Sequence, residues 1–312
     1  MEKKFVSVVV YLHNHENRLE RFLKETVGCI RETFENYELI CVDDACSDNT
    51  VINLKKLLAD LCPGDTVTLV RMGTYQGLEA SMNAGRDLSI GDFVFEFDTP
   101  FVNYSADLIL QAYRSIEGGS DLATVSPSNG ISLSSRVFYG IFNHYNRGAS
   151  SLCSETFRLV SRRAINRIKS ISDYIPYRKA VYANCGLKNE IIHYTATETE
   201  KHKAEKNTYE RVNLAFDSFV YFTNFLERMS SFICAFFLLF SVASAAYALW
   251  DHFVNGSVIE GWTSIICFMS FGFFGVFLLL TIILKYLSVI LNLIFKRQKY
   301  LVSSIEKAGG NQ

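Results

Sequence analysis

Acidic residues end two apolar stretches of this sequence, where they could bind a metal ion or a polar ligand. "FVFEFDTP" reaches Asp98, and "YELICVDD" ends on Asp43 and Asp44. Two acids spaced Asp-x-Asp offer a divalent ion such as Mg²⁺ the oxygen ligands that it prefers, but Pro100 replaces the second acid after Asp98. The stretch therefore fits a metal site, an impaired version of one, or an ordinary polar strand end.

Polar side chains also follow the first apolar stretch, "FVSVVV". Tyr11, Asn14 and Glu16 lie there, and His13 and His15 alternate with Asn14. The two histidines have no third metal ligand nearby in the sequence, so a metal site built on them is disfavoured.

The elements that carry these residues alternate between strand and helix. Apolar, β-branched stretches predict strands over 5–10, 37–44, 65–72 and 91–98, and helical spacing predicts helices near 17–34, 47–61 and 77–88. This alternation predicts a doubly wound, mostly parallel α/β sheet. Ligands bind such sheets beyond the carboxyl ends of the strands, so the loops at 11–16, 43–48 and 98 onward should form one crevice.

Composition and missing motifs narrow the function. The 312 residues are 49% hydrophobic and 14% aromatic, with a net charge of −1, which predicts a core plus a membrane part and no general attraction to nucleic acid. The eight cysteines form no Cys-x-x-Cys pair, so reduced thiols and a cytosolic domain are expected. Neither a Gly-x-Gly-x-x-Gly nor a P-loop motif is present, which disfavours dinucleotide-binding oxidoreductases and P-loop enzymes.

Two segments near the C-terminus are long enough to cross a membrane. Residues 231–250 and 262–284 contain no charged side chain, and a membrane helix needs about 20 such residues. No Lys or Arg lies between Arg228 and Lys285, so both termini should face the cytosol. A soluble protein with a hydrophobic helical hairpin is the alternative.

The predicted organisation has three parts. Residues 1–228 form a cytosolic domain, in which 195–211 is a mobile loop or a solvated linker. Residues 229–295 hold the two membrane helices, and 296–312 form a cytosolic tail. The helix predicted in 134–148 is either an interfacial helix or a core helix.

Several motifs together resemble a known family. "VSVVVYLHNHEN", "CVDDACSDNT", "GLEASMNAG" and "GDFVFEFD", in this order, are similar to family 2 glycosyltransferases with a GT-A fold. "SSRVFYGIFN" and "FRLVSRRAI" resemble the branch that glycosylates polyprenyl phosphates, which includes GtrB-like and dolichyl-phosphate mannose synthase-like enzymes. The resemblance covers nearly the whole chain, and two C-terminal membrane helices fit this branch.

The resemblance implies roles for the residues singled out above. It assigns nucleotide binding to five of them and a divalent metal, Mg²⁺ or Mn²⁺, to Asp98. The nucleotide-binding residues are Tyr11, Asn14, Glu16, Asp43 and Asp44. The chain departs from the family at Pro100, at Asn103 and at Thr156, each of which replaces an acid. The metal site therefore has fewer acidic ligands than in the family.

Basic residues could hold phosphate groups, because a guanidinium binds phosphate oxygens through paired N–H groups. Arg158, Arg162, Arg163 and Arg136 are the candidates. Attraction to anionic lipid is the alternative reading for each, and it is preferred for Arg162 and Arg163. Arg158, together with Asp98, is predicted to be catalytic.

The predicted function is that of an inverting glycosyltransferase at the cell membrane. It moves a sugar from a nucleotide-sugar to a polyprenyl phosphate on the cytosolic face, for cell-surface glycan synthesis. A UDP-hexose is the preferred candidate for the donor. A catalytically impaired membrane subunit that binds nucleotide or partner proteins is the alternative. The sequence leaves the oligomeric state open, a homo-oligomer included.

Overall fold

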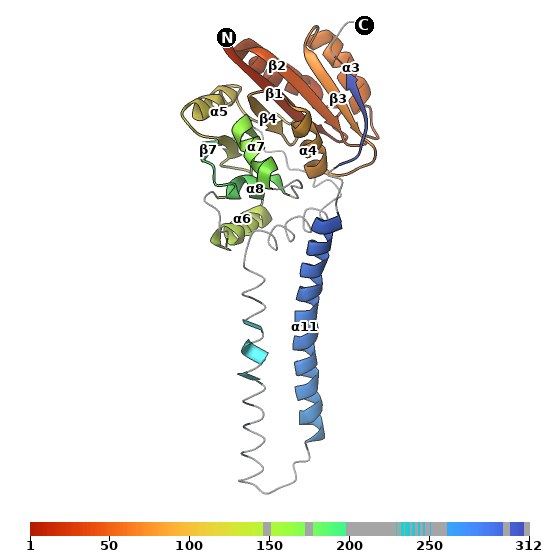
Figure 1. Ribbon diagram of the computed structural model, residues 1–312, viewed down its shortest axis with the longest axis vertical. Helices are drawn as coiled ribbons and strands as arrows, with labels where there is room; N and C mark the ends of the chain where they lie inside the picture. Colours follow the sequence, from red (N-terminus) through yellow and green to blue (C-terminus); the bar gives the residue numbers. More distant parts are fainter. Residues whose placement is uncertain are drawn as a thin grey trace. The chain divides into compact units, whose positions relative to one another are not determined.

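The computed structural model describes residues 1–145, 151–171, 177–197, 261–295 and 300–308, and isolated residues between 229 and 250 (Figure 1). Contacts divide the chain into two compact units. The first contains residues 1–214 together with 297–312, and the second contains residues 215–296. The predicted loop at 195–211 lies outside the described residues from 198 onward.

One mixed eight-stranded sheet forms the centre of the first unit, in the order β7-β5-β6-β4-β1-β2-β3-β8. The strands are β1 (Glu2–Leu12), β2 (Phe34–Asp43), β3 (Thr66–Met72), β4 (Phe93–Phe97), β5 (Leu122–Pro127), β6 (Phe157–Ser161), β7 (Asn189–Tyr194) and β8 (Val302–Lys307). β1 pairs in parallel with both β2 and β4, and β2 pairs in parallel with β3. The predicted α/β sheet is therefore confirmed, with β6 and β8 added as antiparallel strands.

Helices cover both faces of this sheet (Figure 1). They are α1 (Leu19–Arg21), the π-helix η1 (Phe22–Val27), α2 (Gly28–Thr33), α3 (Thr50–Leu61), α4 (Leu78–Leu88), α5 (Asp107–Glu117), α6 (Leu133–Tyr145), α7 (Arg162–Ile171) and α8 (Arg178–Asn184). Val8 and Val10 of β1 belong to the core on one face, and Val9 to the core on the other. Burial on both faces explains why the strands are apolar at nearly every position.

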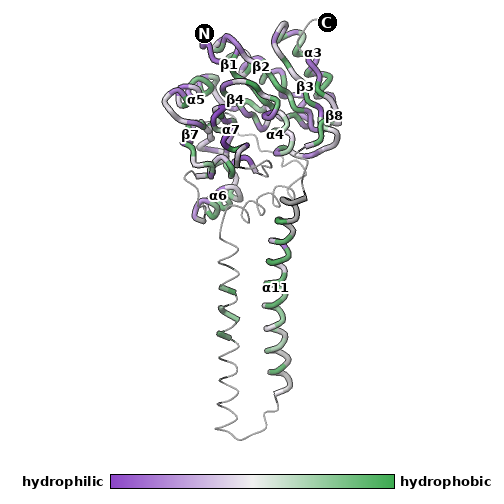
Figure 2. The backbone as a smooth tube through the Cα atoms, viewed as in Figure 1, coloured by the Kyte–Doolittle hydropathy of each residue, from purple (hydrophilic) through white to green (hydrophobic). Residues whose placement is uncertain are grey.

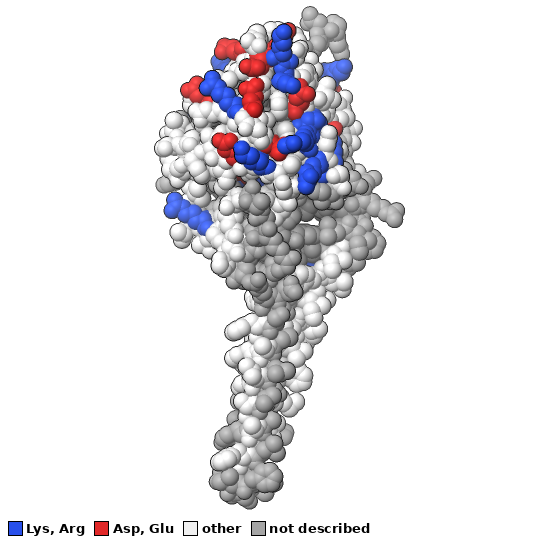
Figure 3. All heavy atoms as spheres, turned by 60° about the vertical axis from the view of Figure 1, so that its left-hand side comes forward, with Lys and Arg blue, Asp and Glu red and all other residues white. Residues whose placement is uncertain are grey.

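The segment predicted as a cytosolic tail contains a strand. Val302–Lys307 forms β8 and pairs antiparallel with β3 at the edge of the sheet. Lys55 Nζ lies 2.7 Å from a Glu306 carboxylate oxygen, which ties β8 to α3. The surface of the first unit mixes Lys and Arg with Asp and Glu on the face shown in Figure 3.

The second unit contains the long helix α11 (Trp262–Phe295), which includes the second predicted membrane segment. Figure 2 shows hydrophobic residues along its length. The first predicted segment, 231–250, lies mostly outside the described residues. A search of the described part of the chain finds no helix that combines the length and apolarity of a membrane crossing.

Gly91 precedes β4 and lies against the backbone of β1. A Cβ atom here would lie 2.6 Å from the Ser7 amide nitrogen and 2.8 Å from Ser7 Oγ. Gly91→Ala is therefore expected to lower the free energy of unfolding by about 1–3 kcal/mol through overpacking. Gly140→Ala is the matched control, because a Cβ there meets nothing within 4 Å and alanine favours the helix by up to about 1 kcal/mol. Thermal unfolding compares them, and equal midpoints would contradict the expectation.

Candidate functional site

The loops after β1, β2 and β4 leave the sheet at the same edge, as the sequence predicts. Leu12 pairs with Asp43 at the ends of β1 and β2, and Val10 pairs with Phe97 at the ends of β1 and β4. Because these strands are parallel neighbours, the polar residues that follow them share one edge of the sheet.

Asp44 is fully buried and its carboxylate accepts three hydrogen bonds. The donors are the amides of Gln76 and Gly77, both at 2.8 Å, and the Tyr11 hydroxyl at 3.0 Å. Burial, followed by the charge of Asp44, raises the pKa of Tyr11 well above its ordinary value, so the hydroxyl stays protonated and donates. Asp44 thus joins β1 and β2 to the 73–77 loop, which precedes α4.

Asp43 has a different environment. Its side chain is 7% exposed, and its Oδ1 accepts the Cys46 amide at 2.9 Å. Ala45 has a φ of 52°, and this left-handed turn brings the Cys46 amide back to Asp43. The Cys46 side chain also hydrogen-bonds to the Asp43 carboxylate, so the contacts of Asp43 come from its own turn, and a carboxylate can accept further hydrogen bonds from a ligand.

Asn14 and Glu16 connect the β1 loop to the β2 loop. Asn14, at a φ of 56°, accepts the amides of Ser47 at 2.9 Å and Asp48 at 3.3 Å through Oδ1. Glu16 accepts the Asn49 amide at 3.3 Å, next to the first residue of α3. These side chains hold the loop that carries Asp43 and Asp44.

An aromatic pair lies beside this loop. The His13 and Tyr75 rings have centroids 4.7 Å apart, and the Tyr75 side chain is 40% exposed. His13 Nδ1 also lies 2.8 Å from the Asp44 carbonyl oxygen. The 73–77 loop therefore contacts the β1 and β2 loops through both hydrogen bonds and rings.

Asp98 is surrounded by cations. Arg178 donates to its Oδ1 at 2.7 Å, and Arg158 donates to its Oδ2 at 3.4 Å. Lys179 Nζ lies 4.0 Å from the same oxygen. Burial alone would raise the pKa of Asp98, but Arg178, Arg158 and Lys179 outweigh it and hold that pKa well below its ordinary value.

A buried ion network extends from Asp98. Arg178 is completely buried, donating to Glu79 at 2.9 Å and to Glu96 at 2.7 Å. Glu96 is also buried and accepts the Tyr182 hydroxyl at 2.6 Å. Arg158, 2% exposed, lies 2.6 Å from a Glu155 carboxylate oxygen. The predicted role of Arg158 in holding phosphate stays a prediction, and the observed contacts of its guanidinium are with carboxylates and with the Tyr182 ring.

The first turn of α4 connects the two halves of the site. The Gly77 amide donates to Asp44, and two residues later Glu79 accepts both the amide and the side chain of Arg178. Arg178 in turn binds Asp98. This chain of contacts places the nucleotide-binding candidates and Asp98 in one connected site.

Six members of this network escaped the sequence analysis: Glu79, Glu96, Glu155, Arg178, Lys179 and Tyr182. Glu96 carried a detectable signal, because it lies two residues before Asp98 on the same face of a buried apolar strand, and a buried acid requires a partner. Arg178 and Lys179 lie in a stretch without a motif, and only folding brings them to β4.

The side chains around Asp98 do not fit a divalent ion. Both carboxylate oxygens already face guanidinium or ammonium groups, which repel a further cation. Pro100 supplies no side-chain oxygen. The part of the chain that the structure describes holds no cluster of three metal-ligating His, Cys, Asp or Glu side chains.

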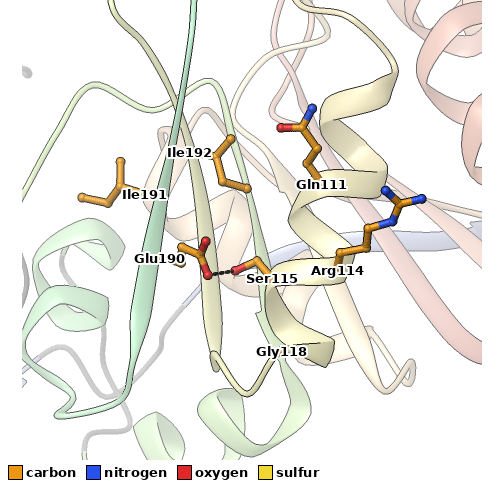
Figure 4. Close-up of a pocket in the computed structure, with 7 residues that line it drawn as sticks. All are labelled: Gln111, Arg114, Ser115, Gly118, Glu190, Ile191 and Ile192. Atoms are coloured by element: carbon orange, nitrogen blue, oxygen red, sulfur yellow. Dashed lines mark hydrogen bonds between the residues drawn. The ribbon is translucent and has the colours of Figure 1, made fainter.

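A surface hollow of ≈ 500 Å³ lies elsewhere, between α5 and β7 (Figure 4). Glu190, near the start of β7, accepts the Ser115 hydroxyl there at 2.6 Å. The hollow is at the amino end of β7, and none of the predicted site residues lines it. The connected site around Asp44 and Asp98 is the better candidate, because it gathers the acids and cations.

Two further arginines hold the backbone or a buried acid. Arg162 donates to the carbonyl oxygens of Ser89 and Gly91 at 2.9 Å or less. Arg163 makes two hydrogen bonds of 2.6 Å with Asp121. Neither contact is with Asp98, so these side chains fix the start of α7 to its neighbours.

A comparison with protein families matches the part of the chain that carries the site, from β1 to β4. Residues 7–99 match the family model described as Glycosyl transferase family 2. The chain is 23% identical over 307 residues to an uncharacterized glycosyltransferase of Synechocystis sp., covering 96% of this chain and 95% of that protein. It is 23% identical over 277 residues to the bactoprenol glucosyl transferase of Shigella phage SfX, covering 85% and 88%.

A solved structure shares the fold. The mannosyltransferase PcManGT from Pyrobaculum calidifontis, in complex with GDP-Man and Mn²⁺, aligns with a TM-score of 0.52 at 13% identity, covering 96% of this chain and 89% of that one. This likeness confirms the predicted GT-A-like α/β fold with a mixed sheet.

Proposed function

We propose that this chain, which carries a glycosyl transferase family 2 domain, moves a sugar from a nucleotide-sugar to a polyprenyl phosphate. The observation that carries the proposal is the connected site, in which Asp43 and Asp44 at the end of β2 are joined through α4 to Asp98 at the end of β4. The bactoprenol glucosyl transferase that the chain resembles supports a polyprenyl-phosphate acceptor.

Asp43 is the residue we assign to direct nucleotide contact. A carboxylate has about four acceptor sites, so Asp43 can accept hydrogen bonds from a base N–H or from ribose hydroxyls as well as from its own turn. Asp44 and Tyr11 use their polar atoms on each other and on the 73–77 loop. Together with Asn14 and Glu16 they shape the pocket. UDP is the nucleotide we propose.

An anionic acceptor simplifies the chemistry. A hydroxyl acceptor needs a general base at neutral pH, whereas a phosphate monoester, with a second pKa of about 6, already carries a nucleophilic oxygen. Attack from the side opposite the leaving nucleotide would invert the anomeric centre. The protein must then neutralise the leaving diphosphate, and we assign this to Lys179, whose Nζ lies 4.0 Å from an Asp98 oxygen and whose side chain is 14% exposed.

Two apolar surfaces support a location at the cell membrane. Leu133, Val137 and Ile141 lie at intervals of four residues along α6 and are at least 40% exposed, which forms a stripe on one face of the helix. In α11, Phe274, Phe277 and Leu284 are more than 60% exposed. Exposed apolar surface of this kind is typical of membrane or protein contacts. We propose that both termini face the cytosol.

Transfer by the purified full chain tests the proposal. The protein is incubated in detergent with undecaprenyl phosphate and each of UDP-glucose, UDP-N-acetylglucosamine, GDP-mannose and dTDP-glucose, and glycolipid is detected by mass spectrometry. A glycolipid with at least one donor is the expected result. If calorimetry shows nucleotide binding but neither glycolipid nor donor hydrolysis appears, the alternative of an impaired binding subunit is correct; Pro100 and the occupied Asp98 favour that alternative.

Metal dependence provides a separate prediction. Sequence resemblance predicts a divalent ion, and the mannosyltransferase of the same fold was crystallised with Mn²⁺, but cations already face Asp98 here. EDTA is therefore expected to change the dissociation constant for UDP less than about twofold, measured by calorimetry. A loss of binding that added Mn²⁺ or Mg²⁺ restores would show that a divalent ion binds at this site.

A further inference from the structure

The segment that follows α11 in sequence returns to the donor side of the sheet. The first residues that the structure describes after α11 are Tyr300 and Leu301, immediately before β8. The Gly73 amide donates to the Leu301 carbonyl oxygen at 2.9 Å, and the Tyr300 hydroxyl donates to Asp87 at 3.2 Å. These contacts join the C-terminal segment to both ends of the stretch that runs from the 73–77 loop through α4.

Gln76 makes the closest connection. Its side-chain amide nitrogen donates to the Leu301 carbonyl oxygen at 2.7 Å, and its side-chain oxygen accepts the Leu301 amide at 2.8 Å. The side chain thus pairs with one backbone residue as a neighbouring strand would. The two partners are separated by 225 residues in the sequence.

The backbone of the same residue contacts the site. The Gln76 amide donates to Asp44 at 2.8 Å, and the next amide, of Gly77, donates to the other Asp44 oxygen at the same distance. Gly77 has a φ of 85°, a left-handed conformation that glycine adopts without strain. Gln76 therefore holds Leu301 with its side chain and Asp44 with its backbone.

We propose that Leu301, held by Gln76, positions the 73–77 loop of the nucleotide pocket, so that donor affinity depends on the strand that follows α11. Gln76 and Leu301 are positioning residues, since neither is required to touch the substrate. The inference rests on the proposed function, because it assigns the pocket beside Asp44 to the nucleotide of the donor.

The exposure and composition of the 73–77 loop explain why it depends on hydrogen bonds to another segment of the chain. Residues 73–75 are exposed, and glycine at 73 and 77 gives the loop more conformations to lose on ordering than other residues would. Hydrogen bonds from a paired strand restrict those conformations before the ligand binds. Preorganisation of this kind raises affinity without adding a contact to the ligand.

Gln76→Ala tests the inference, because it removes both hydrogen bonds to Leu301 and keeps the amide that Asp44 accepts. Calorimetry with UDP and the full chain is expected to show a dissociation constant raised at least about fivefold, the effect of losing one to two ordinary hydrogen bonds. Gln76→Glu keeps the acceptor for the Leu301 amide and loses the donor, so an intermediate affinity is expected.

Lys55→Ala is the matched control. It removes the ion pair with Glu306 in the same strand but leaves the 73–77 loop untouched, so the UDP affinity should stay within about twofold of the unchanged protein. In transfer assays Gln76→Ala should raise KM for the donor and leave kcat unchanged, which a general loss of folded protein would not do.

The outcomes separate the two proposals. If the unchanged protein binds no UDP, the proposed function fails. If it binds UDP and Gln76→Ala binds equally well, or if Lys55→Ala weakens binding as much as Gln76→Ala does, the positioning role is wrong.

Discussion

Replacing Arg178 with methionine is expected to destabilise the protein by about 3–5 kcal/mol, the range observed when one partner of a buried ion pair is removed. Arg178 is completely buried and donates to Glu79, Glu96 and Asp98. Methionine fills much of the volume but leaves these carboxylates without their shared cation. For a unit of this size the loss corresponds to a fall of about 6–20 °C in the unfolding midpoint.

Arg21→Met is the control for this measurement. Arg21 pairs with Glu25 on the helix surface, where both side chains are more than 40% exposed, and such pairs contribute at most about 1 kcal/mol. Thermal unfolding of the full-length variants in the same detergent compares the two substitutions. Similar midpoints would mean that the network around Asp98 does not depend on Arg178.

Asp43→Ala is expected to weaken UDP binding by about 10- to 150-fold, because a hydrogen bond to a charged group contributes about 1.5–3 kcal/mol. In the proposed function, Asp43 Oδ2 accepts a hydrogen bond from the nucleotide. Asp43→Asn retains an acceptor for the Cys46 amide, so the turn is kept, but it removes the negative charge. Weakened UDP binding by this variant as well would therefore show that the loss comes from the contact with the nucleotide and not from a disturbed turn. Calorimetry at one ionic strength measures the UDP dissociation constant of the unchanged protein, Asp43→Ala and Asp43→Asn.

Asp48→Ala serves as the control in the same loop. Asp48 Oδ1 accepts the Thr50 amide at 3.0 Å at the start of α3, so its loss should cost about 1 kcal/mol of stability, as for a helix cap, and leave UDP affinity nearly unchanged. If Asp48→Ala weakens UDP binding as much as Asp43→Ala, the effect belongs to the loop as a whole and the direct contact is refuted.

The parallel part of the fold could be predicted because its signals are local. β-branched stretches such as "FVSVVV" favour strands, and their alternation with helical spacing implies parallel neighbours whose carboxyl ends meet. The grouping of Tyr11, Asp44 and Asp98 at one edge follows from that topology. β8 was missed because its pairing with β3 depends on a contact across most of the chain.

The sequence alone determined the family 2 resemblance, the doubly wound sheet and the loops that carry the acids, since these depend on residue type and short-range spacing. Only the tertiary structure decided which charges meet. It places Arg178 and Lys179 at Asp98 and pairs Gln76 with Leu301. Burial makes an unpaired charge or amide costly, so the folded chain must supply a partner for each of them. These partners lie far apart in the sequence, and residue spacing does not predict them.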